Sequence, residues 1–247
     1  MWDDARQLNA AAMVLTALAV LALAWALLTW VARRPAFEIN EVVITTPLQR
    51  VNAAALEAAI RDELKGTFFT MRLDRARTSL VNVAWVRNVA LRRQWPHRLE
   101  IAVEEHVPFA RWNEGALVNV QGEVFSAACK DELPRLAGPD GTAEDVVRRH
   151  REWSASVAGL GLTLEELRLS ARGAWTLRVA SANGPLGIEL GRDDPGAALA
   201  RFVASYERIL GSLARVGTRV EQVDMRYRNG FAAKVPAFRE RTVKKAA

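Results

Sequence analysis

The chain has 247 residues, of which half are apolar and a quarter are charged. This composition excludes an intrinsically disordered chain, and the length is sufficient to bury a core. The net charge is +6, but the cations are spread along the chain and do not form one patch, so we do not expect nucleic-acid binding. The single cysteine, Cys129, excludes an internal disulfide.

Residues 10–32 form an uncharged, apolar run that predicts a membrane-spanning helix. As a helix the run would extend about 34 Å, against a hydrocarbon core of about 30 Å. A cleaved signal peptide is the alternative, but residues 1–9 lack its basic region, and its apolar core is usually only ~7–15 residues long. We therefore expect an uncleaved anchor. Its orientation stays open, because Arg33 and Arg34 follow the helix and only Arg6 precedes it.

The next seventy or so residues show the pattern strand, helix, helix, strand, strand. A first strand is expected over residues 37–44, and helices over residues 51–66 and 73–86. Asn52 is the expected N-cap of the first helix, since its side-chain oxygen can accept a first-turn N–H. Gly66 suits the end of that helix.

Two half-buried strands are expected on either side of a turn at residues 94–98, because apolar and polar residues alternate there. Pro96 suits the turn, and Pro108 is expected to end the second strand. We expect the Trp95 indole to cover the end of the core; the alternative is that it contacts a partner.

The region from residue 107 to residue 236 alternates short strands with two amphipathic helices, which predicts an α+β layer. Asp194 is the expected cap of the second helix, with Pro195 at its first position. Two short strands are expected within residues 116–125, around Gln121–Gly122, and residues 134–161 are expected to hold a strand, a turn and an amphipathic helix. Further strands are expected over residues 164–169, 175–179, 187–190, 219–227 and 231–236, and the second helix is expected within residues 193–217.

The sequence contains no recognisable catalytic, metal-binding or cofactor-binding motif. His97 and His150 are expected to be solvated surface residues. Glu104, Glu105 and His106 are adjacent, but on a strand only the first and third share a face. We therefore expect no enzyme activity, no metal and no cofactor.

The segment from Trp85 to Trp112 resembles the POTRA end of the FtsQ/DivIB family of bacterial cell division proteins. It carries the family pattern of a WV, an arginine, a WP, an LxIxV run, an acidic residue and a VPxARW. These correspond to Trp85–Val86, Arg93, Trp95–Pro96, Leu99 to Val103, Glu105 and Val107 to Trp112. The strings "GEVF", "LPRLAGPDG", "ELGR", "LARF" and "DMRY" continue the resemblance in the family's order.

The resemblance implies a cytoplasmic tail (1–9), a transmembrane helix (10–32), a POTRA domain (36–106), a C-terminal β domain (107–236) and a flexible tail (237–247). The fold class implied is α+β: a β-α-α-β-β POTRA domain, then a mixed domain with a mostly antiparallel sheet and two helices on one face. The N-terminus would be cytoplasmic and the body periplasmic, in the inner membrane at the septum.

An exposed edge at the last strand, Phe231–Val235, could pair with a strand of another protein. The alternative is a merely solvated edge, guarded by Lys234 and Pro236. The resemblance implies that the edge binds FtsB, which pairs with FtsL, and that the POTRA domain docks other divisome proteins. The residues implied for partner binding are Arg192, Tyr227, Asn229, Gly230, Phe231, Ala232 and Ala233.

Two other functions compete with a division scaffold. A chaperone-like POTRA component of outer-membrane protein insertion would usually carry a barrel, for which too few residues remain. A membrane-anchored wall enzyme would need a catalytic constellation.

Overall fold

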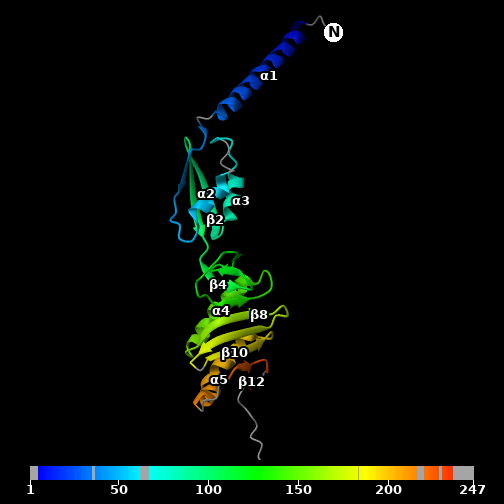
Figure 1. The fold of residues 1–247 in the computed structure, drawn as a ribbon. Helices are drawn as coiled ribbons and strands as arrows, with labels where there is room; N and C mark the ends of the chain where they lie inside the picture. Colours follow the sequence, from blue (N-terminus) through cyan, green and yellow to red (C-terminus); the bar gives the residue numbers. More distant parts are fainter. Residues whose placement is uncertain are drawn as a thin grey trace, which may run out of the picture. The chain divides into compact units, whose positions relative to one another are not determined.

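The computed structural model describes residues 5–34, 37–61, 67–182, 184–215, 220–227 and 230–235. The chain divides into two compact units, Met1–His106 and Val107–Ala247. Figure 1 shows the order of the elements along both units. Each unit has its own sheet, so each is described by itself.

The first unit begins with helix α1 (Ala5–Ala32), which contains the apolar span. The window Asn9–Ala32 has a mean hydropathy of 2.5 and none of it is buried within the protein. Its two threonines are satisfied inside the helix, because Thr16 donates to the Ala12 carbonyl and Thr29 to the Ala26 carbonyl. A span in hydrocarbon needs such internal partners for its hydroxyls.

A three-stranded sheet with two helices follows α1. The elements are β1 (Glu41–Ile44), α2 (Ala53–Arg61), α3 (Leu73–Val81), β2 (Val86–Gln94) and β3 (Arg98–Glu105). The sheet order is β1-β3-β2, with β1 parallel and β2 antiparallel to β3. This confirms the β-α-α-β-β order of a POTRA domain.

The helices of this sheet form for the expected local reasons. The Asn52 side-chain oxygen accepts the Ala54 N–H at 2.9 Å, so Asn52 caps α2. Leu56 and Ile60 of α2 and Leu80 of α3 are buried against the sheet. The expected end of the first helix at Gly66 lies outside the described residues.

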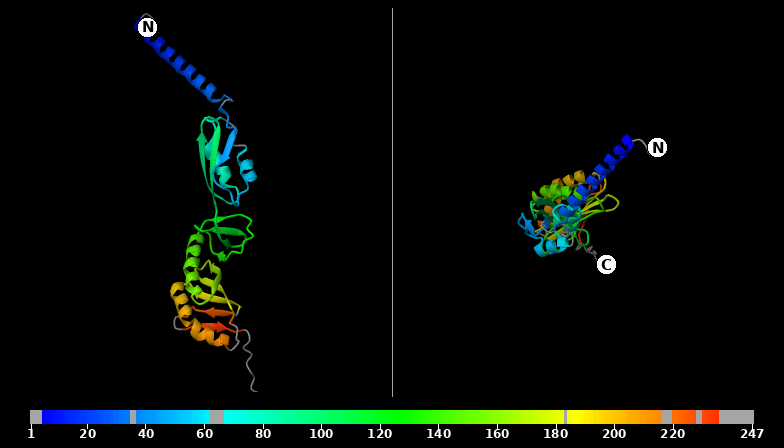
Figure 2. Two further views of the ribbon diagram at one scale, coloured as in Figure 1. Left: turned by 90° about the vertical axis from the view of Figure 1, so that its left-hand side faces the viewer. Right: turned by 90° about the horizontal axis from the view of Figure 1, so that it is seen from above.

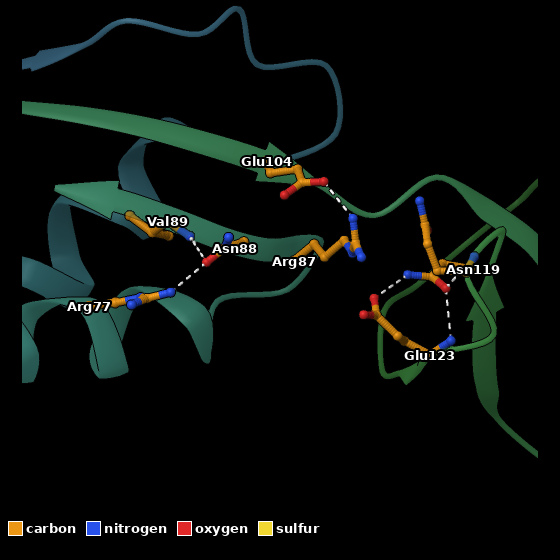
Figure 3. Close-up of polar contacts among 8 residues, drawn as sticks. Arg77, Arg87, Asn88, Val89, Glu104, Asn119 and Glu123 are labelled. Carbon is orange, nitrogen blue, oxygen red and sulfur yellow. Dashed lines mark hydrogen bonds and ion pairs between the residues drawn. The ribbon is translucent and has the colours of Figure 1, made fainter. Parts of the chain in front are cut away.

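Hydrogen bonds of polar side chains fix the ends of β2 and β3. Arg87 lies 2.5 Å from the Glu104 carboxylate. Arg77 donates to the Asn88 amide oxygen, which also accepts the Val89 N–H. Figure 3 shows these contacts. Glu105 accepts the N–H groups of residues 49, 50 and 51, just before α2. Glu104 therefore links β3 to β2, and Glu105 links β3 to the loop before α2.

Four expectations for this unit are wrong in detail. The second helix, expected to run to residue 86, ends at Val81, and Val86 is already the first residue of β2. The first strand covers only Glu41–Ile44, although Glu38 forms an isolated bridge with Thr67. Trp95 does not cover the core, because 70% of its surface is exposed at the tip of the β2–β3 hairpin. Pro108 does not end β3, which stops at Glu105; it is the first residue of the next strand, a position that needs no N–H.

The second unit contains one nine-stranded sheet. Its strands are β4 (Pro108–Trp112), β5 (Ala116–Asn119), β6 (Val124–Phe125), β7 (Arg135–Ala137), β8 (Thr163–Leu169), β9 (Trp175–Ser181), β10 (Gly184–Gly191), β11 (Gln222–Asp224) and β12 (Ala232–Lys234). The order is β12-β11-β10-β9-β8-β7-β4-β5-β6. Five of the neighbouring pairs are antiparallel and three are parallel, so the sheet is mostly antiparallel, as expected.

Helices α4 (Ala143–Ala158) and α5 (Pro195–Arg215) cover one face of this sheet, as the left view of Figure 2 shows. Alternation along β9 places Trp175, Leu177 and Val179 in the core beneath the helices. The Asp194 carboxylate accepts the Ala197 N–H at 3.0 Å and caps α5, as expected.

His150 is buried in this core, so its expected place on the solvated surface is wrong. Only 7% of its surface is exposed, and its ring packs edge-on against Phe109. Nε2 lies 3.4 Å from the Leu164 carbonyl. Burial lowers the pKa of His150 below its usual value of 6.5, since charging the ring would require water that the core excludes.

Candidate functional site: the edge at β12

The candidate site is the end of the nine-stranded sheet formed by β12, with β11 beside it. β11 lies parallel to β10, with Val223 opposite Ile188, and antiparallel to β12, with Val223 opposite Ala233. Val223 of β11 is 1% exposed, and Met225, which follows β11, is 2% exposed, so this part of the chain packs in the core. All three residues of β12 are exposed. The sheet therefore ends in a solvated strand on a well-packed support.

The direction of the backbone groups on β12 follows from the hydrogen bonds on β11. Gly187 N–H donates to the Glu221 carbonyl, and Met225 N–H donates to the Glu189 carbonyl. The Glu221 carbonyl and the Met225 N–H, on either side of Val223, thus face β10, which directs the peptide groups of Val223 to β10 as well. The Glu221 N–H, just before β11, instead donates to the Lys234 carbonyl of β12 at 3.0 Å. Because successive peptide groups alternate, residues 222 and 224 face β12, where they oppose Lys234 and Ala232. The N–H and C=O of Ala233 consequently point away from β11, towards the outer edge.

An ion-pair cluster stiffens the support of this edge. The Arg226 guanidinium donates from Nε and Nη2 to the Asp224 carboxylate at 2.6–3.0 Å, and Nη2 lies 3.4 Å from Glu189 of β10. Gln222 donates to Glu189 at 2.5 Å. The Arg226 hydrogen bonds hold the pKa of Asp224 below its usual value. The hydrogen bonds and charge of Asp224 in turn raise the pKa of Arg226, a group that is charged at every accessible pH in any case.

This cluster was not among the predicted site residues, although the sequence contains a signal for it. Asp224 and Arg226 are two residues apart, and such residues share one face of a strand. Gly191 at the end of β10 has a φ of +77°, and a side chain there would lie 3.0 Å from Arg226 Cγ. The positive φ, together with this close approach, favours glycine at the end of β10 beside the Arg226 stem.

The predicted partner-binding residues fall into two groups. Gly230 and Phe231 directly precede β12, and Ala232 and Ala233 are in it, so these four are brought together at the edge. Phe231 also packs in part against the core, so its ring is not a purely external contact. Tyr227 is 59% exposed in the segment after β11. The prediction for Asn229 lies outside the described residues.

Arg192 lies at the same end of the sheet as the start of β12. It directly follows β10, where Glu189 opposes Asp224, which in turn opposes Ala232. β10 is two strands from the edge, about 10 Å at the usual strand spacing. The Arg192 side chain is 72% exposed and lies 3.5 Å from the exposed Asp193 carboxylate. It is thus placed to reach an acidic group beside the edge.

The opposite end of the sheet offers a shorter edge. β6 contains only Val124 and Phe125, whereas β12 contains three residues and continues an extended segment from Phe231 to Val235. Two of the β12 residues are alanines, whose small side chains leave the backbone accessible. Lys234 is the one charged residue of β12, of a type that often protects edges against unwanted pairing.

The fold defines the class: a protein with one candidate N-terminal membrane helix, a POTRA domain and a second domain whose open, mixed sheet ends in an exposed strand. The family model for the FtsQ-type POTRA domain matches residues 37–106, and that for the C-terminal region of cell division protein FtsQ/DivIB matches residues 110–226.

Curated relatives give the same result over nearly the whole chain. Cell division protein FtsQ of Burkholderia pseudomallei is 39% identical over 246 residues, covering 97% of this chain and 96% of the relative. That of Bordetella pertussis is 38% identical, covering 94% and 92%, and that of Escherichia coli is 32% identical, covering 86% and 78%. The chain belongs to the FtsQ/DivIB family of cell division proteins.

Proposed function

We propose that this protein is a non-enzymatic scaffold of the division machinery, which joins early and late division proteins at the septum. Membership in a cell division family and one apolar span near the N-terminus support this role. In the proposed arrangement residues 1–9 are cytoplasmic, residues 10–32 cross the inner membrane, and the domains at 36–106 and 107–236 are periplasmic. Residues 237–247 form a tail.

The proposed partner at the C-terminal domain is FtsB, paired with FtsL, and the proposed contact is a partner strand added to β12. The observation that carries this proposal is the position of β12 at the end of the sheet, with the Ala233 peptide groups directed outwards. An extended segment can extend a sheet by main-chain hydrogen bonds at such an edge, whatever its side chains. The POTRA domain is the proposed docking area for other division proteins.

Main-chain pairing alone gives modest affinity. A strand that makes three or four new hydrogen bonds gains roughly 0.5–1.5 kcal/mol from each, before the cost of ordering is subtracted. Side chains must therefore contribute, and Tyr227 and Arg192 are placed to do so. Tyr227 supplies exposed aromatic area, and Arg192 supplies a charged donor for a carboxylate.

The test compares two substitutions of one residue in the full-length chain, in lipid nanodiscs. Ala233→Pro removes the outward N–H but leaves the pairing of Lys234 and Ala232 with β11 intact, whereas Ala233→Ser keeps the N–H. We expect Ala233→Pro to weaken FtsB–FtsL binding by tenfold or more and Ala233→Ser to leave it within twofold. Equal affinities for the two variants, with unchanged thermal unfolding, would contradict strand addition.

A further inference from the structure

We propose that the end of the POTRA domain nearest α1 binds the anionic phospholipid headgroups of the bilayer that α1 spans, with Phe69 and Trp95 as its apolar contacts. This membrane-contact surface consists of Phe69, Arg92 and Trp95, together with Arg33 and Arg34 at the end of α1. It is separate from the edge at β12; it rests on the membrane span within the proposed function, but not on partner binding.

Exposed apolar side chains are concentrated at this end. Among the described residues of the first unit outside α1, three large apolar side chains are exposed: Phe69 at 54%, Trp95 at 70% and Val81 at 38%. Two of the three therefore belong to the membrane-contact surface. Exposing two aromatic rings to water is unfavourable. The apolar ring of Phe69 and the amphipathic indole of Trp95 are both suited to the headgroup region of a bilayer.

Hydrogen bonds tie both aromatic residues to the segment that leaves the membrane helix. Phe68 N–H donates to the Phe37 carbonyl at 2.6 Å, and Asn40 N–H donates to the His97 carbonyl at 3.0 Å. These two bonds place the turn that carries Phe69 and the hairpin tip that carries Trp95 on either side of residues 37–41.

The tether length limits how far this surface can move from the bilayer. Phe37 is five residues beyond Ala32, the end of α1, and Asn40 is eight residues beyond it. Fully extended, these segments span at most about 18 Å and about 28 Å. The Thr67 hydroxyl donates to the Ala32 carbonyl at 2.5 Å, which shortens the first of these paths. Both rings are thus within reach of the headgroup layer.

Ring packing holds Phe69 in its exposed position. Its centroid lies 5.4 Å from that of Phe37 and 5.3 Å from that of Phe68, with edge-to-face angles of 70° and 76°. Phe69 thus completes a small aromatic cluster next to the membrane exit. Such pairs fix the ring orientation and leave one side of Phe69 in solvent.

Cations that phospholipid phosphates attract lie near this surface, although Glu38, Glu41 and Glu100 lie at the same end of the domain. Arg33 and Arg34 directly follow α1, and the Arg34 guanidinium lies 3.6 Å from the centre of the Trp30 ring. Arg92 is exposed three residues before Trp95. Each arginine near an anionic surface contributes about 1 kcal/mol to attraction. Contact with lipid phosphates would also explain why the Arg33–Arg34 pair lies on this side of the helix, where the positive-inside rule does not call for it in the proposed orientation.

The experiment uses the full-length chain in nanodiscs of phosphatidylethanolamine and phosphatidylglycerol that contain a headgroup-attached nitroxide quencher. On a Cys129→Ser background, a fluorophore is attached at Gln94→Cys, beside Trp95. The control position is Ala84→Cys, which is exposed at the far end of β2, about 30 Å away at the usual rise per residue.

We expect the quencher to reduce emission at position 94 at least threefold more than at position 84. Combined Phe69→Ser and Trp95→Ser substitutions are expected to abolish that difference, and replacing phosphatidylglycerol by phosphatidylcholine to reduce it by half or more. Equal quenching at positions 94 and 84 would overturn the proposal. It would also be overturned if position 94 became shielded only after a division protein is added.

Discussion

Arg226 binds Asp224 through both Nε and Nη2, and so joins the segment after β11 to the last residue of β11, the strand that supports the sheet edge. Arg226 also approaches Glu189 on β10, at 3.4 Å. The Arg226 side chain therefore connects β11 to β10 while remaining on the surface of the sheet. Because β12 pairs only with β11 among the described strands, the order of β11 determines the order of the edge.

Replacing Arg226 should affect the edge more than the overall stability. Arg226→Met retains the stem beside Gly191 but removes the ion pair. Because the Arg226 side chain is 59% exposed and water screens the pair, we expect little change in the free energy of unfolding. FtsB–FtsL affinity should fall about threefold or more, because the edge becomes less ordered. Isothermal titration calorimetry measures the affinity, and the Tyr206→Phe variant serves as a control away from the edge. Unchanged affinity in Arg226→Met would show that the ion pair does not support binding.

The same pair predicts a pH dependence at acid pH. The pKa of Asp224 is lowered in the folded protein, chiefly by the Arg226 hydrogen bond, so the unfolded state binds a proton more readily. The stability from this pair is present above the usual pKa of 3.8 and is lost as the pH falls through the lowered value. Chemical denaturation between pH 5 and pH 2 should show a smaller loss for Asp224→Asn than for the unsubstituted protein. Identical pH profiles would exclude this contribution.

His150 predicts a second pH dependence, in a different range. Its pKa is lowered by burial and by the nearby Arg151 charge, although the Leu164 carbonyl opposes this. Below about pH 6.5 the unfolded state is therefore protonated before the folded state, and stability falls. His150→Gln can keep a hydrogen bond to that carbonyl but does not titrate. We expect its unfolding free energy to vary less between pH 7.5 and pH 5 than that of the unsubstituted protein; equal slopes would contradict the assignment.

The neighbouring residues Glu104 and Glu105 should differ in their effect on the POTRA domain. Glu105→Ala removes the acceptor of three backbone N–H groups, and we expect it to cost roughly 1–2 kcal/mol of stability. Glu104→Ala breaks only an ion pair whose glutamate is 52% exposed, and should cost at most about 0.5 kcal/mol. Denaturant titration of both variants gives the comparison. Equal losses would mean that Glu105 does not hold the loop.

Local sequence signals predicted the elements well, because each depends on near neighbours. The caps at Asn52 and Asp194 and the turn at Pro96 follow from side-chain and φ preferences, and all three are present. His150 could have been placed correctly: it lies four residues after Val146 and three before Trp153, on the apolar face of α4.

Long-range pairing was not predictable in the same way. No local signal places β11 parallel to β10, or β7 between β4 and β8, because these neighbours are chosen by how the whole sheet buries its core. The exposure of Trp95 was not predicted because a general preference of the residue type was given more weight than its local position. A tryptophan usually lies in a core, and its position at a hairpin tip outweighs that preference. The edge position of β12 becomes visible only once the full strand order is known.

Amide hydrogen exchange of the full-length protein, read residue by residue by NMR before and after addition of FtsB–FtsL, tests strand addition most directly. The Ala232 N–H faces Asp224 within the sheet, whereas the Ala233 N–H faces outwards. We expect exchange at the Ala233 N–H to slow at least tenfold on binding, while exchange at the Ala232 N–H changes little. Saturating partner with no slowing at Ala233 would contradict strand addition.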